Sequence, residues 1–271
     1  YPNWIEMPSE SFLGAAELAF ISMEQSQTRY SSWIALSEEI AGLDETLLYY
    51  SFDNHSPWSR TLNDLSRNSN GAVVGCKWTD GRWAGKSALD FTNKNDQVRL
   101  ELPTQHLAIT LGAWIKLDKL NEYPVPIISS DSNTNGAVSW FINPDGKLVL
   151  QITKDGTPVR YESAVAFHKN RLGRWMHIAT TFNHETQLVS HYVNGRSFSR
   201  EKITNIIPVS FGPCLLGNFS KKSFIKKRRS MQGKIDEFVL FDQAYEEAGI
   251  RRLYEIGCPY EIPTAFGSST P

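Results

Sequence analysis

From Leu47 to Phe241 the chain is a succession of short segments rich in β-branched, aromatic and aliphatic residues, each followed by turn residues. Many strands at short spacing, with no helices alternating between them, are typical of an antiparallel sandwich or jelly roll. The pattern therefore predicts an all-β domain built from antiparallel strands. The predicted strands cover residues 47–53, 87–92, 97–102, 107–117, 125–130, 137–143, 147–153, 159–167, 174–182, 188–194, 211–218 and 234–241.

The residues between several of these segments are of the kind found in tight hairpins. Asparagine, aspartate and glycine tolerate a positive φ, which two-residue hairpin turns require. Such turns join neighbouring antiparallel strands, so they support a sandwich of hairpins. The turn sequences are Asn135-Gly136, Pro144-Asp145-Gly146, Lys154-Asp155-Gly156 and Asn194-Gly195.

The two ends of the chain show helical periodicity instead. Apolar residues at helical spacing predict one helix over residues 11–20 and a second over residues 28–40, with Gly42 as a stop signal. The same spacing within residues 244–257 predicts one short C-terminal helix, directly after the last strand. We therefore expect a jelly-roll sandwich with an N-terminal helical segment and a short C-terminal helix.

This pattern divides the chain into three parts. Residues 1–46 are expected to form a helical linker segment that packs on the sandwich, and residues 47–257 the jelly-roll domain itself. Residues 258–271 are expected to form a C-terminal tail. The length of 271 residues does not require a second domain, because single β-sandwiches of this size are ordinary.

The composition excludes several classes of protein. Hydrophobic residues make up 41% and charged residues 21% of the chain, which is within the globular range. A formal net charge of -1 gives no basic excess, so we expect no nucleic-acid partner. The apolar runs fall far short of the ~20 residues that span a bilayer, so we expect no membrane-spanning segment here. Three cysteines do not make a disulfide scaffold.

Several motifs resemble the laminin-G-like family of concanavalin A-like jelly rolls, in the order in which that family has them. The resemblance covers residues 47–257 and implies a two-sheet sandwich used for recognition or adhesion. The motifs are Leu48-Tyr-Tyr-Ser-Phe-Asp53, Gly85-Lys-Ser-Ala-Leu-Asp-Phe91, Asp96-Gln-Val98, Leu107-Ala-Ile-Thr-Leu-Gly-Ala-Trp-Ile115, Trp175-Met-His-Ile-Ala179, His191-Tyr-Val-Asn-Gly195, Leu216-Gly-Asn218 and Gly233-Lys-Ile-Asp-Glu-Phe238.

A narrower set of motifs resembles one bacterial subset of this family. Thr28-Arg-Tyr-Ser-Ser-Trp33, Leu48-Tyr-Tyr-Ser-Phe52 and Cys76-Lys-Trp-Thr-Asp-Gly-Arg-Trp-Ala-Gly-Lys86 are similar to laminin-G-like domains that follow a FecR-type regulatory domain in planctomycete-like bacteria. The resemblance implies an extracytoplasmic module of a membrane-anchored envelope signalling protein. Because the chain begins at Tyr1, without a leader-like segment, we expect it to be a fragment of that longer protein.

The closing strand carries two adjacent acids, Asp236 and Glu237, among apolar residues. A buried carboxylate is costly unless it is paired, hydrogen-bonded or bound to a metal. The resemblance implies a structural calcium ion that ties the first and last strands together, with Asp53 and Asp236 at the matching positions. Alternatively, Asp236 caps backbone N–H groups or pairs with Arg251 or Arg252. Adjacent strand residues face opposite sides, so we expect Glu237 to point into solvent.

Exposed aromatic residues are the candidates for ligand binding. Trp140 and Phe141 face opposite sides of their strand by alternation, so one of them must lie on an outer or concave surface. Trp58 lies in a loop between predicted strands. Sugar rings stack on such aromatic faces, with polar side chains supplying hydrogen bonds. The partner expected for Trp140 and Trp58 is therefore a carbohydrate or another cell-surface ligand.

The sequence does not favour an enzyme. The Glu-x-Asp-x-x-Glu run of glucanases with this fold is absent, and the adjacent acids of the closing strand are not predicted to face each other. We therefore expect a non-catalytic domain, with a structural or sensory spacer and a glycoside hydrolase as the alternatives. The basic loop over residues 220–232 is either an anion or acidic-glycan patch or a solvated connection between strands.

Overall fold

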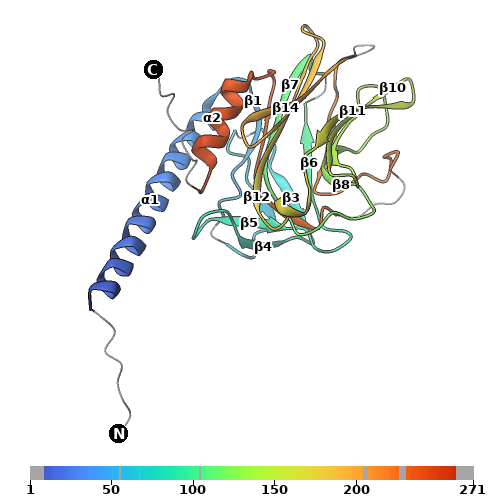
Figure 1. Cartoon of the computed structure of the whole chain (residues 1–271). Helices are drawn as coiled ribbons and strands as arrows, with labels where there is room; N and C mark the ends of the chain where they lie inside the picture. Colours follow the sequence, from blue (N-terminus) through green and yellow to red (C-terminus); the bar gives the residue numbers. More distant parts are fainter. Residues whose placement is uncertain are drawn as a thin grey trace, which may run out of the picture.

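The protein is a β-sandwich of two eight-stranded antiparallel sheets with two helices against one of them (Figure 1). This confirms the predicted fold class. The computed structural model describes residues 9–54, 56–66, 68–103, 105–203, 207–225 and 230–260, and in the first helix it describes side chains from Met23 onward.

The first sheet, sheet A, joins the beginning and the end of the sandwich, because β1 (Thr46–Tyr50) pairs with β16 (Gly233–Phe241). The remaining strands follow one another in the order β14 (Arg196–Lys202), β13 (Leu188–Val193), β12 (Trp175–Asn183), β7 (Ala108–Leu117), β16, β5 (Ser87–Asp90) and β4 (Lys77–Asp80).

The second sheet, sheet B, faces sheet A across the core. Its order is β11 (Thr157–Val165), β10 (Lys147–Lys154), β9 (Val138–Ile142), β8 (Val125–Ser130), β15 (Gly212–Leu216), β6 (Gln97–Leu102), β3 (Gly71–Val74) and β2 (Thr61–Leu62). A short 3-10 helix, η1 (Lys169–Arg171), lies between β11 and β12.

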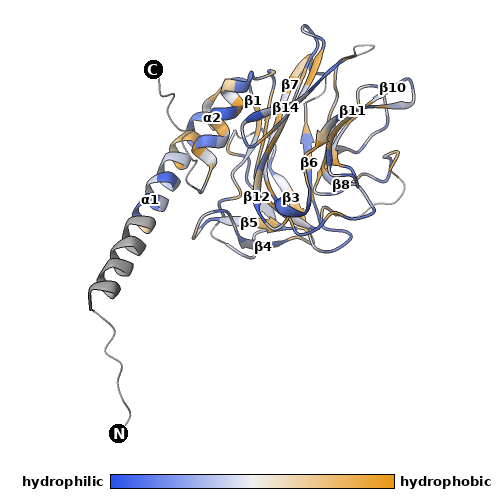
Figure 2. Ribbon diagram, in the orientation of Figure 1, coloured by the Kyte–Doolittle hydropathy of each residue, from blue (hydrophilic) through white to orange (hydrophobic). Residues whose placement is uncertain are grey.

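The core is formed by residues that alternate along the strands. In β6, Val98, Leu100 and Leu102 belong to the core, whereas Arg99 and Glu101 are exposed on the outer side of sheet B. Figure 2 shows the corresponding hydrophobic stretches in strands such as β7 and hydrophilic residues in many connecting loops. Burying this apolar surface between the sheets is the main favourable contribution to folding.

The two N-terminal helices predicted from the sequence are a single helix, α1 (Ser9–Gly42), of 34 residues. The prediction of an interruption was wrong because residues 15–41 contain neither glycine nor proline, so nothing in them ends a helix. The last turns of α1 pack with α2 (Glu247–Gly257) on the outer face of sheet A, where Leu36 contacts the same apolar cluster as Val239 and Ile250. The N-terminal end of α1 extends beyond the sandwich (Figure 1).

Two of the predicted hairpins have the backbone that their sequences require. Asp155-Gly156 and Asn194-Gly195 both have positive φ at each residue, and they join β10 to β11 and β13 to β14. The predicted strands omitted β2, β3, β4 and β14. These strands lie at or near the edges of their sheets, where one or both faces are exposed and the apolar pattern is weak.

Two further observations concern the whole described chain. None of its helices combines the length and the apolar character needed to cross a membrane. The three cysteines, Cys76, Cys214 and Cys258, are all buried and unpaired.

Candidate functional site

The two adjacent acids of β16 lie at a β-bulge. The pairing of β16 with β7 shifts register between Ile235 and Glu237, while Ile235 and Phe238 both belong to the core. A bulge places an extra residue between two core positions, so Asp236 and Glu237 lie together on the outer side of sheet A. Glu237 is only 7% exposed, so the prediction that it points into solvent was wrong.

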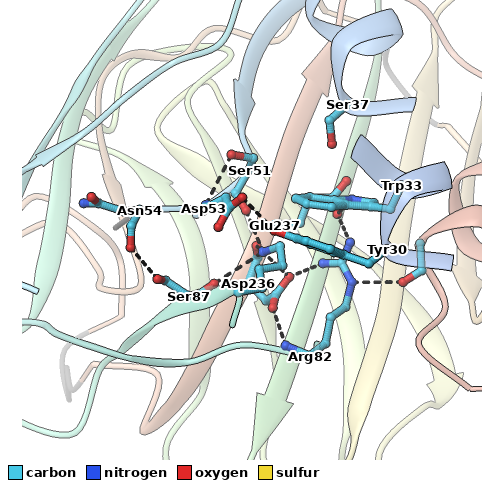
Figure 3. Close-up of polar contacts among 12 residues, drawn as sticks. Tyr30, Trp33, Ser37, Ser51, Asp53, Asn54, Arg82, Ser87, Asp236 and Glu237 are labelled. Carbon is cyan, nitrogen blue, oxygen red and sulfur yellow. Dashed lines mark hydrogen bonds and ion pairs between the residues drawn. The ribbon is translucent and has the colours of Figure 1, made fainter. Parts of the chain in front are cut away.

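A single arginine contacts both acids. Arg82, from the turn between β4 and β5, forms ion pairs through Nη1 with Asp236 and through Nη2 with Glu237. Its backbone N–H donates to Asp236 Oδ2 at 2.6 Å, and its Nε donates to the carbonyl oxygen of Gly257 at 2.9 Å. Figure 3 shows the guanidinium between the two carboxylates and the end of α2. Asp236 is thus satisfied by a residue 154 positions away in the sequence.

Aromatic rings surround the guanidinium. The Arg82 carbon Cζ lies 5.1 Å from the ring centroid of Trp33, 4.3 Å from that of Trp83 and 4.9 Å from that of Trp114. Indole faces attract cations, and they do so most strongly when water is excluded. The three tryptophans therefore compensate part of the cost of burying this arginine.

A buried lysine also contacts Asp236. Lys86 Nζ donates to Asp236 Oδ1 at 2.6 Å, to the Asp236 carbonyl oxygen at 2.7 Å and to the Ser51 carbonyl oxygen at 2.7 Å. Burial lowers the pKa of Lys86 to about 8, although the nearby Asp236 carboxylate acts in the opposite direction. We name Arg82, Lys86, Asp236 and Glu237 the buried charge cluster, which holds two positive and two negative groups.

Helix α1 completes the cluster. Trp33 Nε1 donates to Glu237 Oε2 at 2.8 Å, and the Tyr49 hydroxyl of β1 donates to Glu237 Oε1 at 3.1 Å. The Tyr30 hydroxyl donates to Asp53 Oδ2 at 2.9 Å. Figure 3 shows Tyr30 and Trp33 reaching from the helix toward these acids. The cluster therefore attaches α1 to the first and last strands of sheet A.

The residues around Asp53 and Asp236 do not fit a calcium ion. Calcium takes six to eight oxygen ligands, whereas the carboxylate of Asp236 already accepts from Arg82 and Lys86, two cations that would repel a third. Asp53 Oδ1 is buried without a hydrogen-bond partner, but it supplies one oxygen only. Among the described residues no group of three or more His, Cys, Asp or Glu is arranged to hold a metal.

The alternative pairing with Arg251 or Arg252 is also not made. Arg251 pairs with Glu247 within α2, and Arg252 pairs with Glu39 of α1. Besides its contacts with the two buried cations, Asp236 accepts a hydrogen bond from the backbone N–H of Arg82, which is the other predicted alternative. The ammonium group of Lys86 thus lies among backbone oxygens of Ser51, which follows β1, of Ser87 in β5 and of Asp236 in β16, where a structural cation was predicted.

The unfolding temperature should be the same in EDTA and in excess calcium, measured by circular dichroism or differential scanning fluorimetry. An ion bound only by the folded state would raise the unfolding temperature. A reproducible rise on adding calcium, reversed by chelator, would restore the metal prediction for Asp53 and Asp236.

Trp140 does not lie on a surface. Trp140 is fully buried in the core, and its Nε1 donates to Thr180 Oγ1 at 2.8 Å, so the ring cannot stack on a ligand. This corrects the prediction of a ligand contact. The alternation argument assigned opposite faces, and it is Phe141 that lies on the outer side of sheet B. There Phe219 and Ile225, from the loop after β15, cover it.

Of the two predicted ligand residues, Trp58 is the one whose side chain is exposed to solvent. It lies in the loop between β1 and β2 and is 83% exposed, the largest value among the large hydrophobic residues of the described chain. An aromatic ring presented to solvent in this way suits stacking on a sugar or on another flat apolar surface.

The outer face of sheet B holds an open groove that the sequence did not reveal. The groove has a volume of about 1180 Å³ and runs over β6 and β15, beside the loop that covers Phe141. Alternation in β6 places Gln97, Arg99 and Glu101 in it, and Pro213 and Leu215 of β15 lie opposite Glu101 and Arg99. The outward polar residues of β6 were a signal of this surface, but not of its shape.

Two carboxylates line the groove, Glu101 and Asp131. Asp131 accepts a hydrogen bond from the Ser220 hydroxyl, and its Oδ2 lies 3.8 Å from Lys222 Nζ. These contacts hold Asp131 in a structural role at the edge of the groove. The adjacent acids Asp236 and Glu237 are buried under α1, away from this groove.

A sequence profile of the family Laminin_G_3, described as the Concanavalin A-like lectin/glucanases superfamily, matches residues 91–251, more than half of the chain. No curated protein shows a significant sequence match. Many solved structures share the fold, and three of them are described next.

The receptor binding domain of botulinum neurotoxin D has a TM-score of 0.59 and 15% identity, over 80% of this chain and 53% of that one. The botulinum neurotoxin serotype D ligand binding domain in complex with N-acetylneuraminic acid has a TM-score of 0.58 and 15% identity, over 78% and 51%. Domain 4 of AbnA, a GH43 extracellular arabinanase from Geobacillus stearothermophilus, in complex with arabinotriose, has a TM-score of 0.57 and 20% identity, over 78% and 98%.

The chain thus spans about half the length of the neurotoxin binding domains, and most of the length of the arabinanase domain. At these identities the likeness shows a common fold.

Proposed function

The chain belongs to the concanavalin A-like lectin/glucanase superfamily, and we propose that it is a non-catalytic recognition domain that binds a glycan in the groove on the outer face of sheet B. The observation that supports this most directly is the groove itself, which is open, large enough for several sugar units and lined by side chains that form hydrogen bonds.

The solved relatives support the same proposal. Two of them are complexes with saccharides, N-acetylneuraminic acid and arabinotriose. A common fold does not imply a common function, so the proposal rests on the groove and treats these complexes as support. Trp58 is a second proposed contact, for a ligand long enough to reach the loop between β1 and β2.

We also propose the cellular setting that the sequence motifs suggest. The domain would lie outside the cytoplasm, in the periplasm or at the cell surface, as part of a membrane-anchored FecR-type signalling protein of planctomycete-like bacteria. The support is the resemblance of residues 28–33, 48–52 and 76–86 to that subset. Protease added to spheroplasts should degrade the domain, and protease added to intact cells should degrade it only if it lies at the cell surface. Protection in both preparations would place it in the cytoplasm and contradict the proposal.

Obstructing the groove should weaken glycan binding. Candidate ligands are first found on a broad glycan array and then titrated by calorimetry. Asn95→Trp places a bulky ring in the groove from an exposed loop position and should weaken binding by about tenfold or more. The matched control Asn170→Trp, at an exposed position in η1, should bind as the original protein does. Trp58→Ala tests the second contact in the same titration.

Equal affinity of Asn95→Trp and Asn170→Trp would show that the glycan binds elsewhere. Silence across the array would overturn the recognition proposal and favour the alternative, a structural or sensory spacer. Release of new reducing ends from a bound polysaccharide would instead favour a glycoside hydrolase.

A further inference from the structure

Positive charge is concentrated in the groove, although the chain as a whole has a formal net charge of -1. Four cationic side chains line it against two carboxylates, Glu101 and Asp131, so the groove has a formal charge of +4 - 2 = +2. All four cations are exposed. They are Lys94, Arg99, Lys221 and Lys222.

Only one of these cations is neutralised by an ion pair within the described residues. Lys222 Nζ lies 3.8 Å from Asp131 Oδ2 and donates to the Asp131 carbonyl oxygen at 3.1 Å. Lys94, Arg99 and Lys221 pair with no carboxylate of the part of the chain that the structure describes. Their charge is thus available to a ligand.

The free cations come from three separate segments. Lys94 lies in the loop between β5 and β6, Arg99 in β6 itself, and Lys221 in the loop after β15. Residues scattered on a convex surface would be solvated independently, whereas these converge on one concave surface. An ionic ligand group in a groove feels several such charges at once.

Arg99 is positioned by a neutral group. With the Gln97 amide turned so that its oxygen faces the guanidinium, that oxygen accepts from Arg99 Nε at 3.0 Å and from Nη2 at 3.2 Å. The amide orients the guanidinium and leaves its charge uncompensated. A planar guanidinium held in this way matches a carboxylate, which accepts two parallel N–H bonds.

An apolar strip lies beside the cations. Leu215 faces Arg99 across the ladder between β15 and β6, and Pro213 faces Glu101. Leu215 is half-buried and Pro213 is exposed. The C–H faces of a sugar ring pack on apolar side chains, while its charged substituent requires a cation next to them. The groove offers both within one pair of strands.

We propose that the ligand is an acidic saccharide, a glycan whose sugar units carry carboxylate groups, and that Arg99 binds a carboxylate with Lys94 and Lys221 beside it. The proposal rests on the proposed glycan-binding function and narrows it to one chemical class.

The test compares each acidic glycan with its own neutral form. Oligosaccharides of galacturonate, glucuronate, mannuronate and sialate are titrated by calorimetry with free carboxylates and again after methyl esterification. At least one free acid should bind, and the affinity of its ester should be lower by a factor of about ten or more. Arg99→Ala and Lys221→Ala should each weaken binding of the free acid by a similar factor, and the exposed control Lys169→Ala should not. Raising the salt concentration should also weaken it.

The possible failures are distinct. If a neutral glycan binds in the groove and free acids bind no better than their esters, the inference about charge is wrong while the recognition function stands. If neither form of any glycan binds, both proposals fail. If an acid binds equally well to Arg99→Ala, Lys221→Ala and Lys169→Ala, the carboxylate lies outside this groove and the inference is again overturned.

Discussion

Replacing Arg82 with methionine should lower the free energy of unfolding by about 3–5 kcal/mol, because it removes one partner of a buried ionic network and leaves a carboxylate without its cation. Methionine retains most of the apolar stem, so the loss reports the charge more than the volume. Lys86 still pairs with Asp236, but Glu237 keeps only the hydrogen bonds from Trp33 and Tyr49.

Urea denaturation measures this change, with Arg196→Met as a matched control at an exposed position on β14. The double variant Arg82→Met with Glu237→Gln restores equal numbers of positive and negative groups in the buried charge cluster, one of each. It should therefore be more stable than Arg82→Met alone, although both of its substitutions remove native contacts. A loss below about 1 kcal/mol, or a double variant less stable than the single one, would show that the ionic network contributes little.

Acidification should destabilise the protein through two buried histidines. Burial lowers the pKa of His177 to about 3, with the charge of Arg82 acting in the same direction, and it lowers the pKa of His191 to about 4. An unfolded histidine has a pKa near 6.5, so between pH 6.5 and 4 the unfolded state binds more protons than the folded state. The contribution of these histidines to the free energy of unfolding is therefore fully present above pH 6.5 and is lost as the pH falls. Each histidine contributes on the order of 3 kcal/mol to the loss by pH 4.

The free energies of unfolding at pH 7 and pH 4, from urea titrations, test this expectation. Other groups of the protein also bind protons over this pH range, so a variant must isolate the histidine. His177→Phe places a ring that cannot be protonated among Trp114 and Tyr254, which now contact the imidazole. It should lose less stability between the two pH values than the original protein. Identical losses would show that His177 does not contribute.

Parts of the site were predictable to different degrees. The acids of β16 were recognised as needing a partner, and that requirement follows from the cost of a buried carboxylate. The partner was not predictable, because Arg82 is 154 residues away in sequence and lies in a turn that resembles an exposed loop. Trp140 shows the same limit. Alternation separates Trp140 from Phe141, but nothing local decides which of the two faces the core.

By itself the sequence determined the class of fold, the position of most strands and the tight hairpins, because a period of two and the φ of Asn-Gly and Asp-Gly turns are local properties. Only the tertiary structure decided that the bulge at Asp236 turns both acids toward one guanidinium, that a lysine ammonium lies where a metal was expected, and that the loop after β15 leaves a cationic groove open. Each of these depends on groups that are distant in the chain and are brought together when strands far apart in the sequence pair within one sheet, β5 with β16 in sheet A and β6 with β15 in sheet B.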